Sequence, residues 1–255
     1  MEITQQSNII KNNNELIETT ETTETTEITE TTEATETRVK LISHSSNPNN
    51  SLDKSANLED MICYCARVSN PSNQTSTLTN SKLIKYLIAN AHWSPFEMVN
   101  ICLEINTTRD IGRQILRHRS FSFQEFSQRY AVADLGFETR QARLQDLKNR
   151  QSSLEIVNND ELVSKWEELQ KELCELASST YSWAISNGIA KEQARAVLPE
   201  GNTMTRMYMN GTLRSWIHYI KLRRENGTQK EHKEIAIQCA NAIKPIFPSI
   251  DNFLS

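Results

Sequence analysis

The sequence contains few cysteines, and their spacing fits neither a disulfide scaffold nor a paired-cysteine site. Five occur among 255 residues, an odd number, and none forms a C-x-x-C pair. A chain of this length can bury a core without cross-links, so disulfides are not needed for folding. We therefore expect reduced thiols in an intracellular protein located in the cytoplasm.

Other signatures are missing as well. The five histidines show no H-E-x-x-H or similar ligand spacing, so we expect no bound metal ion. No apolar run approaches the length of a transmembrane helix, so we expect no membrane partner. The first residues show neither a hydrophobic signal core nor the arginine-rich, acid-poor composition of a transit peptide.

Charge is divided unevenly along the chain. Residues 1–37 hold nine Glu and one Lys, a net charge of −8, whereas the whole chain carries −4. Residues 38–255 therefore carry +4, from 27 basic and 23 acidic side chains. A mildly basic body suits a small phosphorylated ligand, and it is less basic than the usual sequence-independent nucleic-acid-binding domain.

The acidic N-terminal segment is of low complexity. Residues 15–36 place Glu at every third position, with Thr in most of the gaps. A period of three fits neither a helix nor a strand, and the segment has no aromatic residue to bury. We predict a disordered tail at 1–37 and a single domain at 38–255. A neutral extension is the simpler interpretation of the tail, and partner binding is the alternative.

Hydrophobic periodicity predicts an α/β (α+β) domain, helix-rich around a small mixed or antiparallel sheet. The clearest strand is 99–105, where apolar and polar residues alternate, and further strands are predicted at 39–43 and 204–209. Polar loops are predicted at 45–53 and 69–79. Helices are predicted at 58–68, 78–91, 109–119, 161–186, 191–198, 212–224 and 231–243. The long helix carries apolar residues at helical spacing, namely Leu162, Trp166, Leu169, Leu173 and Leu176.

The centre of the chain is rich in arginine. Residues 109–150 contain eight of the fifteen arginines. The predicted helix directs Ile111 and Ile115 to the core, and a polar, aromatic loop follows it as far as Arg129. Beside the apolar stripe lie Gln114 and His118, and Arg113 and Arg117 lie on the neighbouring flank. Guanidinium groups bind phosphate through paired hydrogen bonds, so 117–129 is predicted to bind an anion. A structural salt-bridge network or a solvated basic face is the alternative.

Several motifs resemble one known family. Arg117-His118-Arg119, followed after seven residues by Ser127, is similar to the R-H-R-x7-S signature of the flavin-dependent thymidylate synthases. Segments 92–97 (HWSPFE) and 194–199 (ARAVLP) resemble other family segments in the same order. So do 213–223 and Gln229, and together the matches cover nearly all of 38–255.

The resemblance implies an enzyme that reductively methylates dUMP to dTMP in de novo dTMP synthesis. The implied cofactor is FAD, and the implied co-substrates are methylenetetrahydrofolate as carbon donor and NADPH as reductant. Because no G-x-G-x-x-G occurs, we expect a flavin site that is not of the Rossmann type. The family also implies a homotetramer with active sites shared between chains.

Residue roles follow from the same resemblance. The implied FAD contacts are Ser69, Ser94, Glu97, Arg117, His118, Arg119, Glu125, Thr212, Arg214 and His218. Arg214 and His218 are implied to reach the flavin from a neighbouring subunit. The implied dUMP contacts are Gln114, Arg117, Glu125, Ser127, Gln128, Arg129, Arg195 and Arg223. The chain departs from the family at Thr212 and His218, where Asn is frequent, and at Gly227, where His is common.

The implied catalytic residue is Arg223, which would lie against the uracil and favour its ionised N3 form. A cation that cannot lose its proton stabilises a developing anion. Ionised uracil is electron-rich at C5, so no enzyme nucleophile is required. We accordingly expect Ser127 to bind ligand, because no Ser-His-Asp constellation is evident and no cysteine lies in a nucleophile motif.

Two groups of residues have open interpretations. His92 either faces the flavin ring or packs in the loop before Pro95. Within 138–151, the basic side chains either bind the folate glutamate tail or the NADPH phosphate, or form a solvated helix face or a subunit contact. These side chains are Arg140, Arg143, Lys148 and Arg150.

Two other functions compete with the enzyme. A nucleic-acid-binding module would use the arginine-rich centre, but Phe121, Phe123 and Phe126 fall in one loop rather than across a stacking platform. The acidic tail would also oppose such binding, so we expect no nucleic-acid partner. A family member without activity is disfavoured because Arg195, Arg223 and the whole signature are retained.

Overall fold

The computed structural model describes residues 37–46, 58–156 and 158–253. Residues 1–36 of the predicted disordered tail and most of the predicted loop 45–53 lie outside the described residues, so both stay predictions. Among the described residues, no helix is long and apolar enough to cross a membrane.

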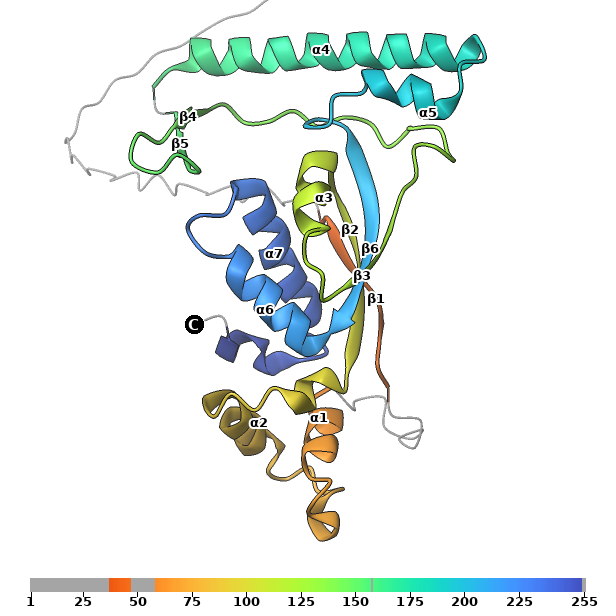
Figure 1. Cartoon of the computed structure of the whole chain (residues 1–255). Coiled ribbons are helices and arrows are strands. Elements are labelled where there is room, and N and C mark those ends of the chain that lie inside the picture. Colours follow the sequence, from red (N-terminus) through yellow and green to blue (C-terminus); the bar gives the residue numbers. More distant parts are fainter. Residues whose placement is uncertain (1–36, 47–57, 157, 254–255) are drawn as a thin grey trace, which may run out of the picture. The chain divides into compact units, whose positions relative to one another are not determined.

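A four-stranded antiparallel sheet in the order β1-β2-β6-β3 organises the fold (Figure 1). The strands are β1 Val39–His44, β2 Asn100–Thr108, β3 Ser122–Glu125 and β6 Met204–Thr212. The longest pairing joins β2 to β6 without interruption, from Asn100 opposite Thr212 to Thr108 opposite Met204. A continuous antiparallel ladder satisfies the backbone polar groups of both strands, so this pair forms the rigid centre of the sheet.

The alternation predicted for 99–105 is confirmed. Ile101, Leu103 and Ile105 are fully buried, and Met207 and Met209 of β6 join them in the core. One face of the sheet is therefore packed, as period-two patterning requires. The mixture of helices with an antiparallel sheet confirms the predicted α+β class.

Helices supply the rest of the core. They are α1 Leu58–Ala66, α2 Asn80–Ala89, α3 Arg109–Ile115, α4 Asp160–Ser186, α5 Lys191–Ala194, α6 Leu213–Arg223 and α7 Lys230–Ile243. Short 3-10 turns occur at η1 Pro71–Asn73, η2 Ser94–Glu97, η3 Arg195–Val197 and η4 Pro248–Phe253. α6 and α7 pack on each other and beside the sheet (Figure 1), where α6 buries Trp216 and Ile220 and α7 buries Ile235.

Local capping explains where two helices begin. The Thr212 hydroxyl accepts a hydrogen bond from the backbone N–H of Ser215 at 3.2 Å, so α6 starts as β6 ends. The Asn159 side chain accepts from Leu162 N–H at 3.1 Å and begins α4. That helix ends before Gly188, whose φ of +77° suits glycine at a helix C-terminus.

Two predictions about the arginine-rich centre are wrong. The predicted helix 109–119 ends at Ile115, so Arg117, His118 and Arg119 lie beyond α3. The loop predicted after it contains strand β3, which pairs with β6. Alternating Ser and Phe at 120–123 is a period-two signal, and the neighbouring polar residues concealed it.

The interpretation of 138–151 as a helix face is also wrong. This segment contributes β4 Arg143–Gln145, which forms a small hairpin with β5 Ser153–Glu155. A three-residue strand is too short to show a clear periodicity in the sequence.

Helix α4 is confirmed, but its apolar stripe is not buried within the chain. The side facing the chain carries smaller or polar residues, among them Gln170, Cys174 and Ala177. The residues of the exposed stripe are 42–66% exposed, namely Leu162, Trp166, Leu169, Leu173 and Leu176. A contiguous apolar surface of this kind is typical of an interface between proteins.

Close packing of β6 against Phe121 provides a test of the sheet. A Cβ added to Gly211 would lie 2.7 Å from Phe121 Cε1, and this ring already packs on Trp216. Gly211→Ala is therefore expected to lower the free energy of unfolding by about 1–3 kcal/mol through overpacking. Urea denaturation followed by circular dichroism measures the change.

Gly201→Ala is the matched control, because a methyl group there meets nothing within 4 Å. If the two variants unfold at the same urea concentration, the described packing of Phe121 against β6 is incorrect.

Candidate active site

Helix α3 directs polar side chains toward two separate groups of residues. Gln114 contacts the N-terminal end of α7, whereas Arg109 and Arg113 contact Glu125 of β3. This division arises because α3 runs between two elements that carry polar groups. Each group is described below by the residues that compose it.

The first group, here named the histidine cluster, consists of His118, Tyr219, Arg223 and His232. The Arg223 Nε–H donates to His118 Nε2 at 2.9 Å. The Tyr219 hydroxyl lies 3.1 Å from His232 Nε2, and the Tyr219 ring stands edge-on to His118 with centroids 4.8 Å apart. The cluster therefore joins the R-H-R signature to the C-terminal end of α6.

Both histidines of the cluster are neutral near pH 7. A guanidinium N–H can only donate, so His118 Nε2 must be an unprotonated acceptor. Burial, followed by Arg223 and Arg117, lowers the pKa of His118 to about 4. Burial, followed by Arg223 and His118, lowers the pKa of His232 to about 3.

The second group, here named the Glu125 cluster, surrounds that carboxylate with cations. Arg109 and Arg113 each approach it at 3.5 Å, and the Thr205 hydroxyl donates to it at 3.0 Å. Arg113 also pairs with Glu200 at 2.8 Å. Burial lowers the pKa of Arg109, and Glu125 opposes that shift.

Two buried donors near this region have no hydrogen-bond partner among the described residues. They are Gln128 Nε2, in a residue that is 4% exposed, and Arg109 Nη1, in a residue that is 8% exposed, whose contact with Glu125 at 3.5 Å is an ion pair without a hydrogen bond. Leaving a buried donor unpaired costs about 1–3 kcal/mol. Such donors are well suited to an anionic or carbonyl-rich ligand.

The third group lies at the start of α6. Glu97, placed by the turn η2, forms an ion pair with Arg214. The His218 ring lies 4.9 Å from Trp93, and burial, Arg214 and Lys221 lower its pKa. Ser94 begins the same turn, and Thr212 is occupied as the cap of α6.

The predicted site residues are therefore only partly assembled within one chain. No hydrogen bond or ion pair among the described side chains joins a member of the histidine cluster directly to a member of the Glu125 cluster. Ser127 and Arg129 are exposed, and Arg129 pairs with Glu192 at 3.6 Å. Arg195 is half-buried in η3, and Ser69 lies exposed beyond α1.

Arg117 and Arg119 remain available to a ligand. Both are exposed, and neither forms an ion pair with a carboxylate in the described part of the chain. His92 is exposed and edge-on to Tyr86, with ring centroids 5.7 Å apart. Phe121 and Phe123 pack against the core, so they do not present a surface for stacking bases.

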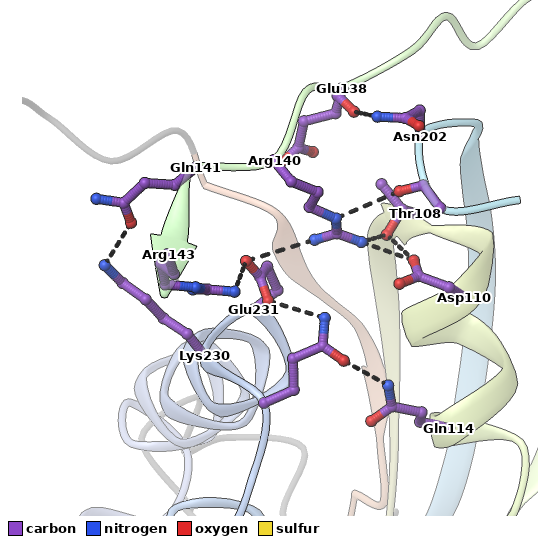
Figure 2. Close-up of polar contacts among 12 residues, drawn as sticks. Thr108, Asp110, Gln114, Glu138, Arg140, Gln141, Arg143, Asn202, Lys230 and Glu231 are labelled. Carbon is purple, nitrogen blue, oxygen red and sulfur yellow. Dashed lines mark hydrogen bonds and ion pairs between the residues drawn. The ribbon is translucent and has the colours of Figure 1, made fainter. Parts of the chain in front are cut away.

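The sequence interpretation missed a partly buried ionic network around Glu231. Arg143 pairs with this carboxylate at 2.7 Å and Arg140 at 3.8 Å, and Arg140 also reaches Asp110 at 2.6 Å (Figure 2). The expectation of a solvated face is thus wrong for Arg140 and Arg143. The i, i+3 spacing of Arg140 and Arg143 does not indicate a partner on α7, so their pairing with Glu231 is visible only in the folded structure.

The described residues contain no group of three or more His, Cys, Asp or Glu arranged to hold a metal ion.

Comparison with known proteins identifies the class. A family model described as thymidylate synthase complementing protein matches residues 51–249. A flavin-dependent thymidylate synthase from Synechocystis sp. is 50% identical over 193 residues, covering 75% of this chain and 87% of that protein. A probable flavin-dependent thymidylate synthase from Paramecium bursaria Chlorella virus 1 is 50% identical over 192 residues, covering 75% and 88%.

These matches show that the protein is an enzyme. The chain belongs to the flavin-dependent thymidylate synthase family, as its motifs predicted. A solved structure of the UMP/dUMP methylase PolB from Streptomyces cacaoi, bound with 5-Br dUMP, shares the fold. Its TM-score is 0.70 at 24% identity, over 85% of this chain and 93% of that one.

The neutral state of His232 predicts a pH dependence of stability. Its folded pKa, about 3, lies below the ordinary value of 6.5, so the unfolded chain binds the extra proton first as the pH falls. Stability from this group is complete above about pH 6.5 and is lost on acidification, by about 2 kcal/mol between pH 7.5 and 5. Urea unfolding at both pH values measures this.

His232→Phe removes that titration, so the gap in unfolding free energy between wild type and variant should narrow at pH 5. His44→Phe, at an exposed position, is the control for exchanging a histidine for phenylalanine. If the difference in unfolding free energy between wild type and His232→Phe is the same at both pH values, His232 is not buried in its neutral form.

Proposed function

We propose that residues 38–255 form the catalytic domain of an enzyme that reductively methylates dUMP to dTMP. Methylenetetrahydrofolate supplies the carbon, and NADPH supplies electrons through bound FAD. The observation that carries the proposal is the contact between Arg223 and the signature residue His118, made on a fold of this family. The five free cysteines support a reducing, cytoplasmic location.

Arg223 is the residue we assign to activation of the uracil. Its Nε is held by His118, and its Nη groups have no partner among the described residues. Because guanidinium keeps its charge, these groups can stabilise a uracil that has lost the N3 proton. Negative charge is then delocalised toward C5, where the new carbon–carbon bond forms. His118 fixes the guanidinium and, being neutral, does not repel it.

The dUMP phosphate is assigned to the residues around the Glu125 cluster. Ser127, Arg129 and Arg195 supply hydroxyl and guanidinium donors, and the unpaired Gln128 Nε2 adds a buried one. Phosphate accepts several charge-assisted hydrogen bonds at once, which matches this donor set. Glu125 orients the neighbouring arginines and can accept from the sugar or base. Gln114 is assigned to the nucleotide from the opposite side of α3.

FAD is assigned to the exposed cations of the signature and to the third group. Arg117 and Arg119 suit a pyrophosphate, and neutral His118 offers its Nδ1–H as a donor. Bound flavin would supply the electrons that convert methylene to methyl. The remaining contacts are assigned to Ser69, Ser94, Glu97, Glu125, Thr212, Arg214 and His218. Thr212 has the weakest support, because its hydroxyl already caps α6.

The chain is proposed to work as a homotetramer with shared active sites. Two observations support this. The assigned dUMP residues fall into separate clusters within one chain, and the apolar stripe of α4 is exposed. Burying such a stripe against another copy removes apolar surface from water, which favours assembly.

The flavin spectrum and the Arg223→Ala variant test the proposed reaction. Purified protein should show a flavin absorbance that NADPH bleaches. Arg223→Ala should lower kcat by about 100-fold or more, because it removes stabilisation of the developing anion. Its flavin content should stay near that of the wild type.

Arg206→Ala is the control, since this exposed arginine of β6 bonds to Asn106 and pairs with Glu104 and is assigned to no ligand. It should leave kcat and flavin content unchanged. A colourless protein that takes up no FAD would contradict the proposed reaction, and equal loss of flavin and turnover in Arg223→Ala would contradict the role of Arg223.

Subunit complementation tests whether sites are shared. Gln114→Ala and Arg195→Ala should each be nearly inactive. Refolding them together should restore about a quarter of wild-type activity, because half of randomly formed pairs are mixed and each mixed pair has one intact site of two. Turnover of dUMP is measured against each variant refolded alone.

Refolding Gln114→Ala with Arg223→Ala is the matched control. Gln114 and Arg223 lie on the same side of one chain and would contribute to the same half of a site. Every chain in this mixture lacks one of the two, so no intact site should form. Failure of the first mixture to recover activity would mean that each chain carries a complete dUMP site.

A further inference from the structure

A continuous chain of hydrogen bonds runs from Glu231 to Gln114 and on to Tyr219. Gln229 Nε2 donates to Glu231 Oε2 at 3.0 Å, and Gln114 Nε2 donates to Gln229 Oε1 at 2.8 Å. Gln114 Oε1 lies 3.2 Å from His232 Nδ1. Figure 2 shows the end of this chain where Arg140 and Arg143 hold Glu231.

The carboxylate at one end sets the direction of every bond in the chain. An ionised Glu231 can only accept, so Gln229 must turn its NH2 group toward it. The carbonyl oxygen of Gln229 then points toward Gln114, so Gln114 must donate from its own NH2 group. The carbonyl oxygen of Gln114 consequently faces His232.

The same logic determines the proton position on His232. Because Gln114 offers an acceptor, His232 Nδ1 must carry the hydrogen, and Nε2 is left as an acceptor for the Tyr219 hydroxyl. His232 is fully buried, so no solvent can substitute for either partner. A protonated imidazole would also donate from Nε2, and the Tyr219 hydroxyl would then have to accept.

The charge states agree with this geometry. Burial alone would raise the pKa of Glu231, but its backbone amide, Gln229, Arg140 and Arg143 together hold that pKa below the usual range. Burial and the nearby cations keep His232 neutral, with a pKa of about 3. Both ends of the hydrogen-bond chain are thus in the states that its direction requires.

We propose that Glu231 and His232 are positioning residues that hold the side-chain amide of Gln114 in one orientation for nucleotide binding. The proposal rests on the proposed function, in which Gln114 contacts dUMP. With both ends engaged, the amide keeps one N–H on Nε2 and one lone pair on Oε1 for a ligand. An amide that is free to flip would exchange the positions of its donor and its acceptor. One of the two orientations would then place donor against donor and acceptor against acceptor on the base.

Five single variants, one of them a control, and one double variant test the inference on the flavin-loaded full-length enzyme. Glu231→Gln keeps the size of the side chain but lets it donate, so the direction of the chain is no longer imposed. His232→Phe removes the donor to Gln114. Each should raise KM and the calorimetric Kd for dUMP by about tenfold, as expected for one misdirected hydrogen bond. At saturating dUMP, kcat should change by less than about threefold, and flavin content should be unchanged.

Two further measurements separate positioning from general damage. His232→Asn should recover most of the affinity lost in His232→Phe, because the Asn amide can replace the Nδ1 donor. Glu231→Gln combined with Gln114→Ala should bind dUMP no more weakly than Gln114→Ala alone, since the first change acts only through Gln114. Glu138→Gln is the matched control. This carboxylate also pairs with an arginine, Arg38, but forms no hydrogen bond to Gln114 in the described part of the chain, so dUMP binding should be unchanged.

The outcomes distinguish the inference from the proposed function. If the wild type turns over dUMP but Glu231→Gln and His232→Phe bind dUMP with normal affinity, the inference is wrong and the proposed function stands. Additive losses in the double variant, or no recovery in His232→Asn, would also overturn it. A wild-type protein that takes up no FAD and binds no dUMP would overturn both.

Discussion

The pairing of β2 with β6 is the constraint on which the rest of the structure depends. α3 begins directly after Thr108 at one end of this pair, and α6 begins directly after Thr212 at the other. The sheet therefore determines where the R-H-R signature and Arg223 can go, although about a hundred residues separate them. Because the ladder is antiparallel and uninterrupted, neither strand can slip without exposing its buried face.

Burial and charge then act together on the groups that the sheet assembles. Low polarity and the adjacent guanidinium of Arg223 keep His118 and His232 neutral, which turns both into oriented hydrogen-bond partners rather than cations. At the other side of α3, Glu125 balances Arg109 and Arg113 in a partly buried setting. One short helix thus separates a group of neutral histidines from a group of paired arginines, and in the proposed function the first serves the base and the second the phosphate.

Much of the fold follows from local patterns. The alternation in β2 and the periodicity of α4, α6 and α7 were sufficient to predict those elements, because one buried face dictates the pattern. The predictions were wrong where a strand is too short for a buried face to set a clear pattern. This applies to β3, a short edge strand, and to β4, which pairs only with β5. The end of α3 was also misplaced, since Arg117 and His118 continue the helical spacing without continuing the helix.

The sequence by itself determined the family, through motifs whose order and spacing are specific, and it predicted functional roles for Gln114, His118 and Arg223. Only the tertiary structure decided that Arg223 holds His118, and that Glu231 is linked through Gln229 to Gln114. These contacts join residues far apart in the chain, so no local period records them. Hydrogen-bond direction and burial, which decide the charge and orientation of each group, are properties of the folded chain alone.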